Sequence, residues 1–229
     1  MTGHPWIFAY AHFGQVIGSP NVVAKLQQQH VTMYEVLTLF QAPSKLLPVI
    51  PTLDFHNEAE MEQVLAHPIP SYFKAVIYDN ERYANTPADE QADPITYTNK
   101  AITLAHAHHL QIICDYIEPS RIKGGYTPAC DIIGLNTVQQ SERSPATYAS
   151  KVAKIVQAVH QANPAVPISA GLSSNPAGSP VTATELIDDI ISTQSEVGGY
   201  WLNVSAPGVG CPDCNEPDPS VAIQTLQGM

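Results

Sequence analysis

Eight short apolar segments recur along this chain, and segments with helix signals separate most of them. Each has the length of a strand buried on both faces, which is typical of parallel sheets. Strands that alternate with helices favour a single α/β architecture. The expected strands cover residues 6–10, 31–37, 47–53, 75–78, 111–114, 132–135, 166–170 and 199–202.

Several helix starts are marked by a capping side chain followed by a proline, which suits the first helical position. This pair begins at Ser19, Asp93, Ser144 and Asp218, and a capping-box pattern begins at Thr182. The expected helices cover residues 20–29, 57–67, 94–109, 145–162, 182–195 and 219–227. Two connections are too short or too rich in Pro, Gly and Ser for a full helix, namely 38–45 and 118–130.

Eight strands in simple alternation favour closure into a barrel. We predict one (β/α)8 TIM-barrel domain over residues 1–229, irregular because helices are missing or shortened after the second and fifth strands. A length of 229 residues suits one domain. An open, doubly wound sheet is the alternative fold.

The chain is acidic, with a formal net charge of −11, and only 14% of its residues are charged. Its three arginines (Arg82, Arg121 and Arg143) do not cluster, so the basic footprint that nucleic acids and anionic membranes require is missing. No apolar run reaches the roughly 18 residues of a membrane span. We therefore expect a small-molecule or glycan substrate as the partner, and leave the oligomeric state open.

The first residues contain no signal peptide. Few Lys and Arg beside many Gln, Asn, Thr and Pro are nevertheless typical of exported proteins, so we predict an extracellular location and leave a cytoplasmic one open. Cys211 and Cys214 follow the last strand and are expected to form a disulfide, which suits an oxidising compartment. Cys130 falls on the opposite face of the barrel, too far from that pair. Cys114 lies within a strand and is expected to be a buried apolar residue.

Polar residues stand at or just past the end of each predicted strand. A parallel barrel brings all these ends to one face, where its active sites are built. The sequence therefore predicts a carboxylate-rich pocket from His12, Glu35, Asp54, Asp79, Glu81, Asp115, Glu118, Asn136, Ser173 and Asn203.

Asp79 and Glu81 are the most informative of these residues. Being two apart on one strand, they point to the same side, together with Ile77. Like charges crowded in a partly buried site raise the proton affinity of one of them, as a general acid requires. We predict Glu81 as the general acid, Asp79 as the group that orients it, and Asp54 as a second catalytic carboxylate. The alternative is that these acids only cap helices or bind loop amides.

With Asp79 and Glu81 on the fourth strand and Trp201 on the eighth, the chain resembles the chitinase-type glycoside hydrolases of family eighteen. Those enzymes are (β/α)8 barrels with an Asp-x-x-Asp-x-Asp-x-Glu motif ending the fourth strand and a tryptophan as the floor of the sugar site. The two earlier acidic positions are Lys74 and Ile77 here. The resemblance implies that Glu81 protonates the glycosidic oxygen and that Asp79 positions the substrate.

The remaining polar and aromatic residues near the strand ends are predicted to bind substrate. Trp201 offers a face for a sugar, although packing inside the barrel is an equal alternative for it. The family has a Tyr-Asp pair at the end of the sixth strand, where this chain has residues 136–139. The predicted binding residues are Tyr10, His12, Glu35, Asp115, Tyr116, Asn136, Gln139, Trp201 and Asn203.

We predict neither a metal nor a cofactor. The strand-end acids together with His12 could hold magnesium or manganese if they converged, but the strands carry no paired metal-ligand motif. Glycine-rich nucleotide motifs and a nucleophile elbow are also absent from the sequence. The His-Ala-His-His run at 106–109 ends a helix, where the helix dipole favours histidine, and we interpret it as structural.

The leading hypothesis is a carbohydrate-active hydrolase that uses the Asp-x-Glu pair. One alternative is a lyase or cyclase that acts on a small metabolite, with magnesium assistance open. A second alternative is a non-catalytic barrel that binds a glycan or a protein. Hydrolysis predicts an open groove with Trp201 exposed in it, and a lyase predicts a closed aromatic pocket. A binding barrel predicts that Asp79 and Glu81 are engaged with no cavity above them.

Overall fold

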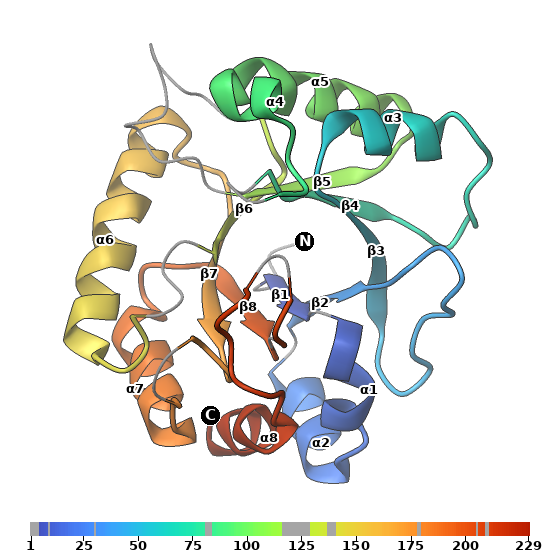
Figure 1. The fold of residues 1–229 in the computed structure, drawn as a ribbon. Helices are drawn as coiled ribbons and strands as arrows, with labels where there is room; N and C mark the ends of the chain where they lie inside the picture. Colours follow the sequence, from blue (N-terminus) through green and yellow to red (C-terminus); the bar gives the residue numbers. More distant parts are fainter. Residues whose placement is uncertain are drawn as a thin grey trace.

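The computed structural model describes residues 5–8, 10–29, 31–80, 84–115, 129–136, 141–177, 180–204, 206–208 and 211–229, with only the backbone for 10–12. Eight parallel strands close into a barrel in the order β1 to β8, which confirms the predicted (β/α)8 fold (Figure 1). The alternative of an open sheet is wrong, because β1 pairs with β8 and places Ile7 opposite Trp201. The strands are β1 (Pro5–Phe8), β2 (Thr32–Val36), β3 (Val49–Phe55), β4 (Ala75–Tyr78), β5 (Gln111–Asp115), β6 (Ile132–Leu135), β7 (Ile168–Ser173) and β8 (Gly199–Asn203).

Helices surround the barrel (Figure 1). They are α1 (Tyr10–Ile17), α2 (Pro20–Gln28), α3 (Glu58–Leu65), α4 (Ala88–Ala92), α5 (Pro94–Ala107), α6 (Pro145–Ala162), α7 (Ala183–Thr193) and α8 (Pro219–Gly228). Asp93 and Asp218 accept backbone N–H bonds at the starts of α5 and α8, and Thr182 forms the predicted capping box of α7. Ser19 and Ser144 occupy the expected N-cap positions of α2 and α6, each before a proline, but their side chains make no capping hydrogen bond.

Two helices were not predicted, α1 and α4. The apolar run at 6–10 was expected to be one strand, but β1 ends at Phe8 and α1 already begins at Tyr10. Residues 38–45 contain no helix, as expected. Of the other connection, 118–130, all but residues 129 and 130 lie outside the described residues.

Apolar side chains pack on both sides of the strands. One cluster fills the barrel interior: Ile7, Tyr34, Val36, Ala75, Ile77, Ile113, Ile132 and Trp201. A larger cluster lies between the barrel and the helices. On β4, Ile77 faces inward and Tyr78 outward, where its hydroxyl donates to Glu90 of α4 at 2.6 Å. The alternation then turns the next residue, Asp79, toward the interior.

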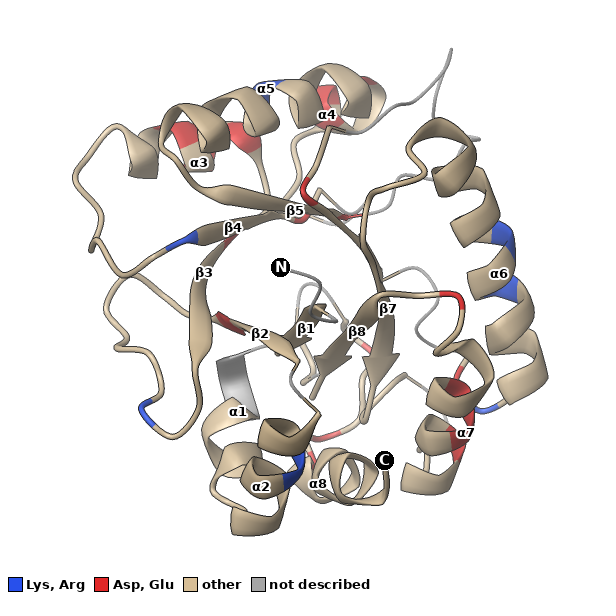
Figure 2. Cartoon of the chain, turned by 180° about the vertical axis from the view of Figure 1, so that it is seen from behind, with Lys and Arg blue, Asp and Glu red and all other residues tan. Residues whose placement is uncertain are grey.

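The described basic residues lie on helices and connections and not within the strands of the barrel. Lysines occur on α2, α5 and α6, in the β2–β3 connection and just before β4 (Figure 2). Within the described residues, no helix has the length and hydropathy required to cross a bilayer.

Two disulfides link the four cysteines. Cys211–Cys214 is the pair expected from the sequence. Cys114 is buried within a strand, as expected, but it is not a simple apolar side chain, because it is bonded to Cys130 with the two Cα atoms 6.0 Å apart. Cys114 faces outward on β5, and Cys130 precedes the neighbouring strand β6, so the two come together on the outside of the barrel.

Candidate functional site

The ends of β3 and β4 bring three polar side chains together at the mouth of the barrel. Asp54 and His56 are two residues apart and face the same way, and Asp79 directly follows β4. Phe55 pairs with Tyr78 across the two strands, so His56 and Asp79 form the next pair. Two neighbouring strands therefore supply one imidazole and two carboxylates to one place.

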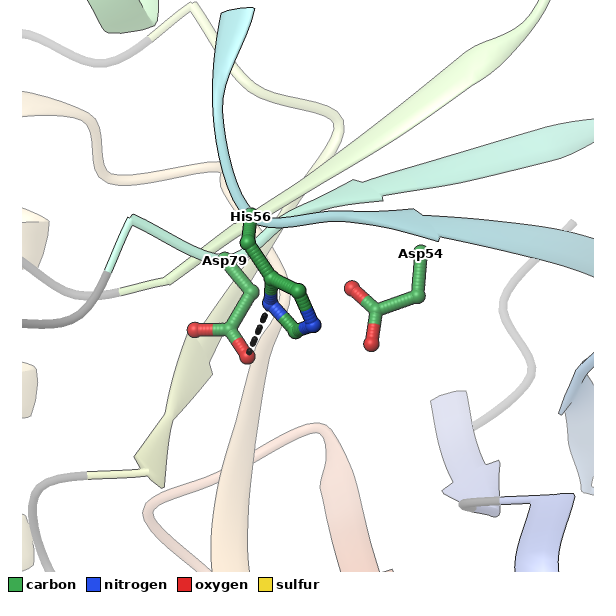
Figure 3. Close-up of side chains that lie close together, drawn as sticks. All are labelled: Asp54, His56 and Asp79. Atoms are coloured by element: carbon green, nitrogen blue, oxygen red, sulfur yellow. Dashed lines mark ion pairs between the residues drawn. The ribbon is translucent and has the colours of Figure 1, made fainter. Parts of the chain in front are cut away.

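The imidazole of His56 lies between the carboxylates of Asp54 and Asp79 (Figure 3). Its Nδ1 is 3.8 Å from Oδ2 of Asp79. One nitrogen or oxygen atom from each of the three residues lies within 4.8 Å of the others. The side chain of Asp79 is 11% exposed and that of His56 is 34% exposed, so the imidazole is the more accessible of these two groups.

Backbone bonds fix the positions of these side chains. The N–H of Asp79 donates to the carbonyl of Phe55 at 2.9 Å, which extends the β3–β4 pairing beyond Tyr78. The hydroxyl of Thr86 donates to the carbonyl of His56 at 3.1 Å. The imidazole of His56 and the carboxylate of Asp79 are therefore attached to backbone that hydrogen bonds hold in place, as a preorganised site requires.

The row of polar groups continues on β5 and β6. Asp115 ends β5 and is 3% exposed, and the pairing of Tyr78 with Cys114 places it beside Asp79. The backbone N–H of Asn136 donates to Oδ1 of Asp115 at 3.4 Å. Asp115 and Asn136 thus lie together where the sequence predicted them.

The mouth ends of β7 and β8 are held by polar contacts. The N–H of Ser173 donates to Oε1 of Glu142 at 2.8 Å, and the N–H of Ser174 donates to the carbonyl of Asn203 at 2.9 Å. Glu142 is completely buried and was not singled out from the sequence, because it lies in the loop before α6. Its position beneath the end of β7 depends on the tertiary fold.

Trp201 lies inside the barrel and is only 3% exposed. A methyl group on Gly134 of β6 would be 2.6 Å from Cε3 of the indole, so the ring passes directly over this glycine. The open groove with an exposed Trp201 is therefore not observed, and the indole packs in the barrel core. A contact between Trp201 and a sugar stays a prediction.

Glu35 lies on the outside of the barrel rather than at the mouth. Tyr34 and Val36 face the interior, so the residue between them points toward the β2–β3 connection. Its Oε2 accepts the N–H of Ser44 at 2.8 Å. Burial raises the pKa of Glu35, and the hydrogen bond from Ser44 opposes this shift. The structure does not bring Glu35 together with Asp54 and Asp79.

Several predicted site residues are not covered by the structure. Glu81, Tyr116, Glu118 and Gln139 lie outside the described residues. Tyr10 and His12 belong to α1, and only their backbone is described.

Sequence reasoning missed His56. The signal was present, because Asp54-Phe55-His56 has the same two-residue spacing that was used for Asp79 and Glu81. The predicted strand was ended at residue 53, so His56 was assigned to the following loop. The structure continues β3 to Phe55 and thereby keeps His56 in phase with Asp54.

Comparisons with known proteins find similarity in fold only. No protein-family model matches the chain, and no curated protein sequence matches it. Among solved structures, an active-site mutant of a Rhizomucor miehei beta-1,3-glucanosyltransferase in complex with laminaritriose aligns over 97% of both chains, with a TM-score of 0.51 and 12% identity. A GH128 (subgroup II) endo-beta-1,3-glucanase from Sorangium cellulosum aligns over 98% of this chain and 96% of its own, with a TM-score of 0.48 and 12% identity.

These similarities bear on the resemblance to family eighteen. At 12% identity, the similarity to the Rhizomucor miehei structure shows the fold alone. The resemblance is therefore supported for the barrel architecture and not for the chitinase family itself.

Proposed function

We propose that the protein hydrolyses glycosidic bonds with carboxylates at the barrel mouth. The observation that carries this proposal is the convergence of Asp54 and Asp79 from neighbouring strands, at the end of the barrel where active sites are built. Most glycoside hydrolases use two carboxyl groups, one to protonate the leaving oxygen and one to act as nucleophile or base.

The roles follow from position. Glu81 is two residues beyond Asp79, and on an extended chain it would share the inward face at a higher level in the mouth. We assign the general acid to Glu81, its orientation to Asp79 beneath it, and the second carboxylate to Asp54. We assign the binding of substrate hydroxyl groups to Asp115, Asn136 and Asn203. This chemistry uses only side chains of the protein and requires no cofactor.

The first substrates to test are beta-1,3-glucans. The similar barrel from Rhizomucor miehei was solved with laminaritriose, a glycan of this class. An extracellular glycan also fits the two disulfides, which persist in oxidising compartments.

The test is a comparison of Glu81→Gln, Asp79→Asn and Asp54→Asn with the wild type. Each is assayed on beta-1,3-glucan, beta-1,4-glucan and chitin oligosaccharides in the presence of EDTA. Because general acid catalysis contributes about 10²–10⁴-fold, Glu81→Gln is expected to lower kcat by that factor on the substrate that is cleaved. Glu62→Gln, which removes an exposed carboxylate on α3, is the matched control and should leave turnover unchanged.

A folded wild-type protein that cleaves none of these glycans would contradict the proposal. So would turnover that survives in all three variants. A lyase or cyclase that acts on a small metabolite is the second candidate, because the buried Trp201 does not offer the exposed face that was predicted for a sugar. If the folded protein cleaves none of the glycans, the lyase or cyclase becomes the preferred function.

A further inference from the structure

His56 is a prominent part of the site that glycoside hydrolysis leaves without a role. It faces the barrel mouth between two carboxylates, and about a third of its side chain is exposed. One imidazole nitrogen and two carboxylate oxygens form a mixed donor set. Such a set suits zinc and other divalent transition metals, whereas calcium and magnesium prefer oxygen ligands alone.

The distance between His56 and Asp79 fits a cation bound between them as well as a direct ion pair. Nδ1 and Oδ2 are 3.8 Å apart, which is too long for a hydrogen bond. Two ligands bound to one zinc ion at ~2.1 Å lie about 3.4 Å apart at the tetrahedral angle and about 4.2 Å apart on opposite sides of the ion. The observed separation falls between these values.

The third donor is close enough to join them. All three ligand atoms lie within 4.8 Å of one another, so the Asp54 carboxylate belongs to the same cluster. Asp54 and His56 come from the end of one strand and Asp79 from its neighbour, so the backbone already holds the three groups in register.

We propose that Asp54, His56 and Asp79 bind one divalent transition-metal cation, with Zn²⁺ as the preferred ion. This site does not depend on the proposed glycosidase activity, and cation binding is measured without any sugar. The cation would engage Asp54 and Asp79, which the proposed glycosidase also uses, so the glycan assays are run in EDTA and cation binding is measured without sugar. In this arrangement a failed glycan assay does not count against the cation, and a failed titration does not count against the glycosidase.

Competing zinc ligands are limited among the described residues. All four cysteines are in disulfides, so no thiolate is available. The main competitor is the region of His106, whose Nε2 lies 3.1 Å from Oδ2 of Asp131 on the outside of the barrel. His108 and His109 follow closely in sequence. This region supplies the matched control, a His–Asp pair that lacks the second carboxylate.

The experiment is a calorimetric titration of EDTA-treated, dialysed protein with Zn²⁺. The variants are His56→Gln, Asp54→Asn and Asp79→Asn, with His106→Gln as the control. We expect one ion per chain in the wild type and in the control. Each of the three site variants should bind at least about 100-fold more weakly, because a direct ligand is worth more than the outer-shell partners, whose loss costs 10–100-fold. Unfolding midpoints measured in EDTA confirm that each variant is folded.

A second measurement uses the wild type alone and so does not depend on any variant folding. Substoichiometric Mn²⁺ should first broaden the backbone amide signals of residues 54–56 and 79. The proposal is overturned if the wild type binds no Zn²⁺, or if His106→Gln removes the binding while His56→Gln retains it. Broadening centred on residues 106–109 would overturn it as well.

Discussion

At the scale of single residues, the barrel interior is filled so tightly that one glycine determines where an indole lies. Gly134 faces inward on β6, and the ring of Trp201 from β8 crosses over it. A methyl group at Gly134 would come within 2.6 Å of both Cε3 and Cζ3 of that ring, which is closer than carbon atoms approach. The glycine is therefore required by packing.

Gly134→Ala is expected to destabilise the protein by about 1–3 kcal/mol, the usual cost of overpacking a core. The buried indole must shift or the backbone of β6 must move, and urea unfolding measures the loss. The double variant Gly134→Ala/Trp201→Phe should recover part of it, because the smaller ring makes room for the methyl group.

Gly14→Ala in α1 is the control for this substitution. Nothing lies within 4 Å of the added methyl group there, and alanine is favoured in a helix by roughly 0.5–1 kcal/mol. We expect Gly14→Ala to be neutral or stabilising. An equal loss of stability in both variants would contradict the packing argument.

The same scale explains which site residues could be predicted. The sequence places Ile77 and Asp79 on one face of β4 because they are two residues apart, but it does not say which face is the interior; the structure shows that Ile77 faces inward. On β2 the residues around Glu35 are apolar on both faces, so the alternation carries no phase information and Glu35 was assigned to the mouth. His56 was missed because a strand end is hard to place when a turn signal is weak.

At the scale of elements, the disulfide Cys114–Cys130 attaches the segment before β6 to the outer face of β5. It closes a loop with a sequence separation of 16, whereas Cys211–Cys214 closes one of only 3. In the chain-entropy account, a disulfide stabilises by restricting the unfolded chain, and the effect grows with loop length.

Replacement of Cys114 and Cys130 by alanine is expected to lower the free energy of unfolding by about 3 kcal/mol, against about 2 kcal/mol for the Cys211/Cys214 pair. Guanidinium unfolding of the two double variants gives both numbers. Because Cys114 is also buried, its replacement leaves a small cavity that adds to the loss. A larger loss from the Cys211/Cys214 variant would contradict this account.

The elements themselves were largely predictable. The strands were placed within two or three residues because buried parallel strands form short, dense apolar runs. Helices α1 and α4 were missed for local reasons: α1 follows β1 after one residue, and α4 has only five residues. The Cys114–Cys130 pairing could not be predicted, because it requires knowledge of which residue of β5 faces outward beside the start of β6.

At the scale of the whole molecule, a buried acid in the helix layer links stability to pH. Asp189 of α7 is completely buried, and neither of its carboxylate oxygens has a hydrogen-bond partner among the described residues. Burial, followed by the nearby carboxylates of Glu142, Asp188 and Glu185, raises the pKa of Asp189 from 3.8 to about 8. Tyr148 and Tyr200 also lie nearby, and burial raises the pKa of each of them above 10.

The direction of the pH dependence of stability follows from the two pKa values of Asp189, 3.8 as the ordinary value and about 8 in the folded protein. Between pH 4 and 8 the folded protein keeps a proton on Asp189 that the unfolded chain has released. Stability contributed by this group is therefore complete below pH 4 and is lost as the pH rises toward 8. For one proton the slope is at most about 1.4 kcal/mol per pH unit.

We expect Asp189→Asn to flatten the fall in stability between pH 5 and 8, because the amide fills the same space and does not ionise. Urea unfolding at several pH values measures the free energy of unfolding of the variant and of the wild type. The raised pKa of Glu35 makes stability fall with pH in the same direction, and the difference between the two proteins removes this contribution. Asp188→Asn is the matched control, since Asp188 is exposed and adjacent, and most of the wild-type slope should remain. Equal slopes for the wild type and Asp189→Asn would mean that the buried carboxyl is already ionised in the folded protein. In that case a cation or an ordered water must lie beside it.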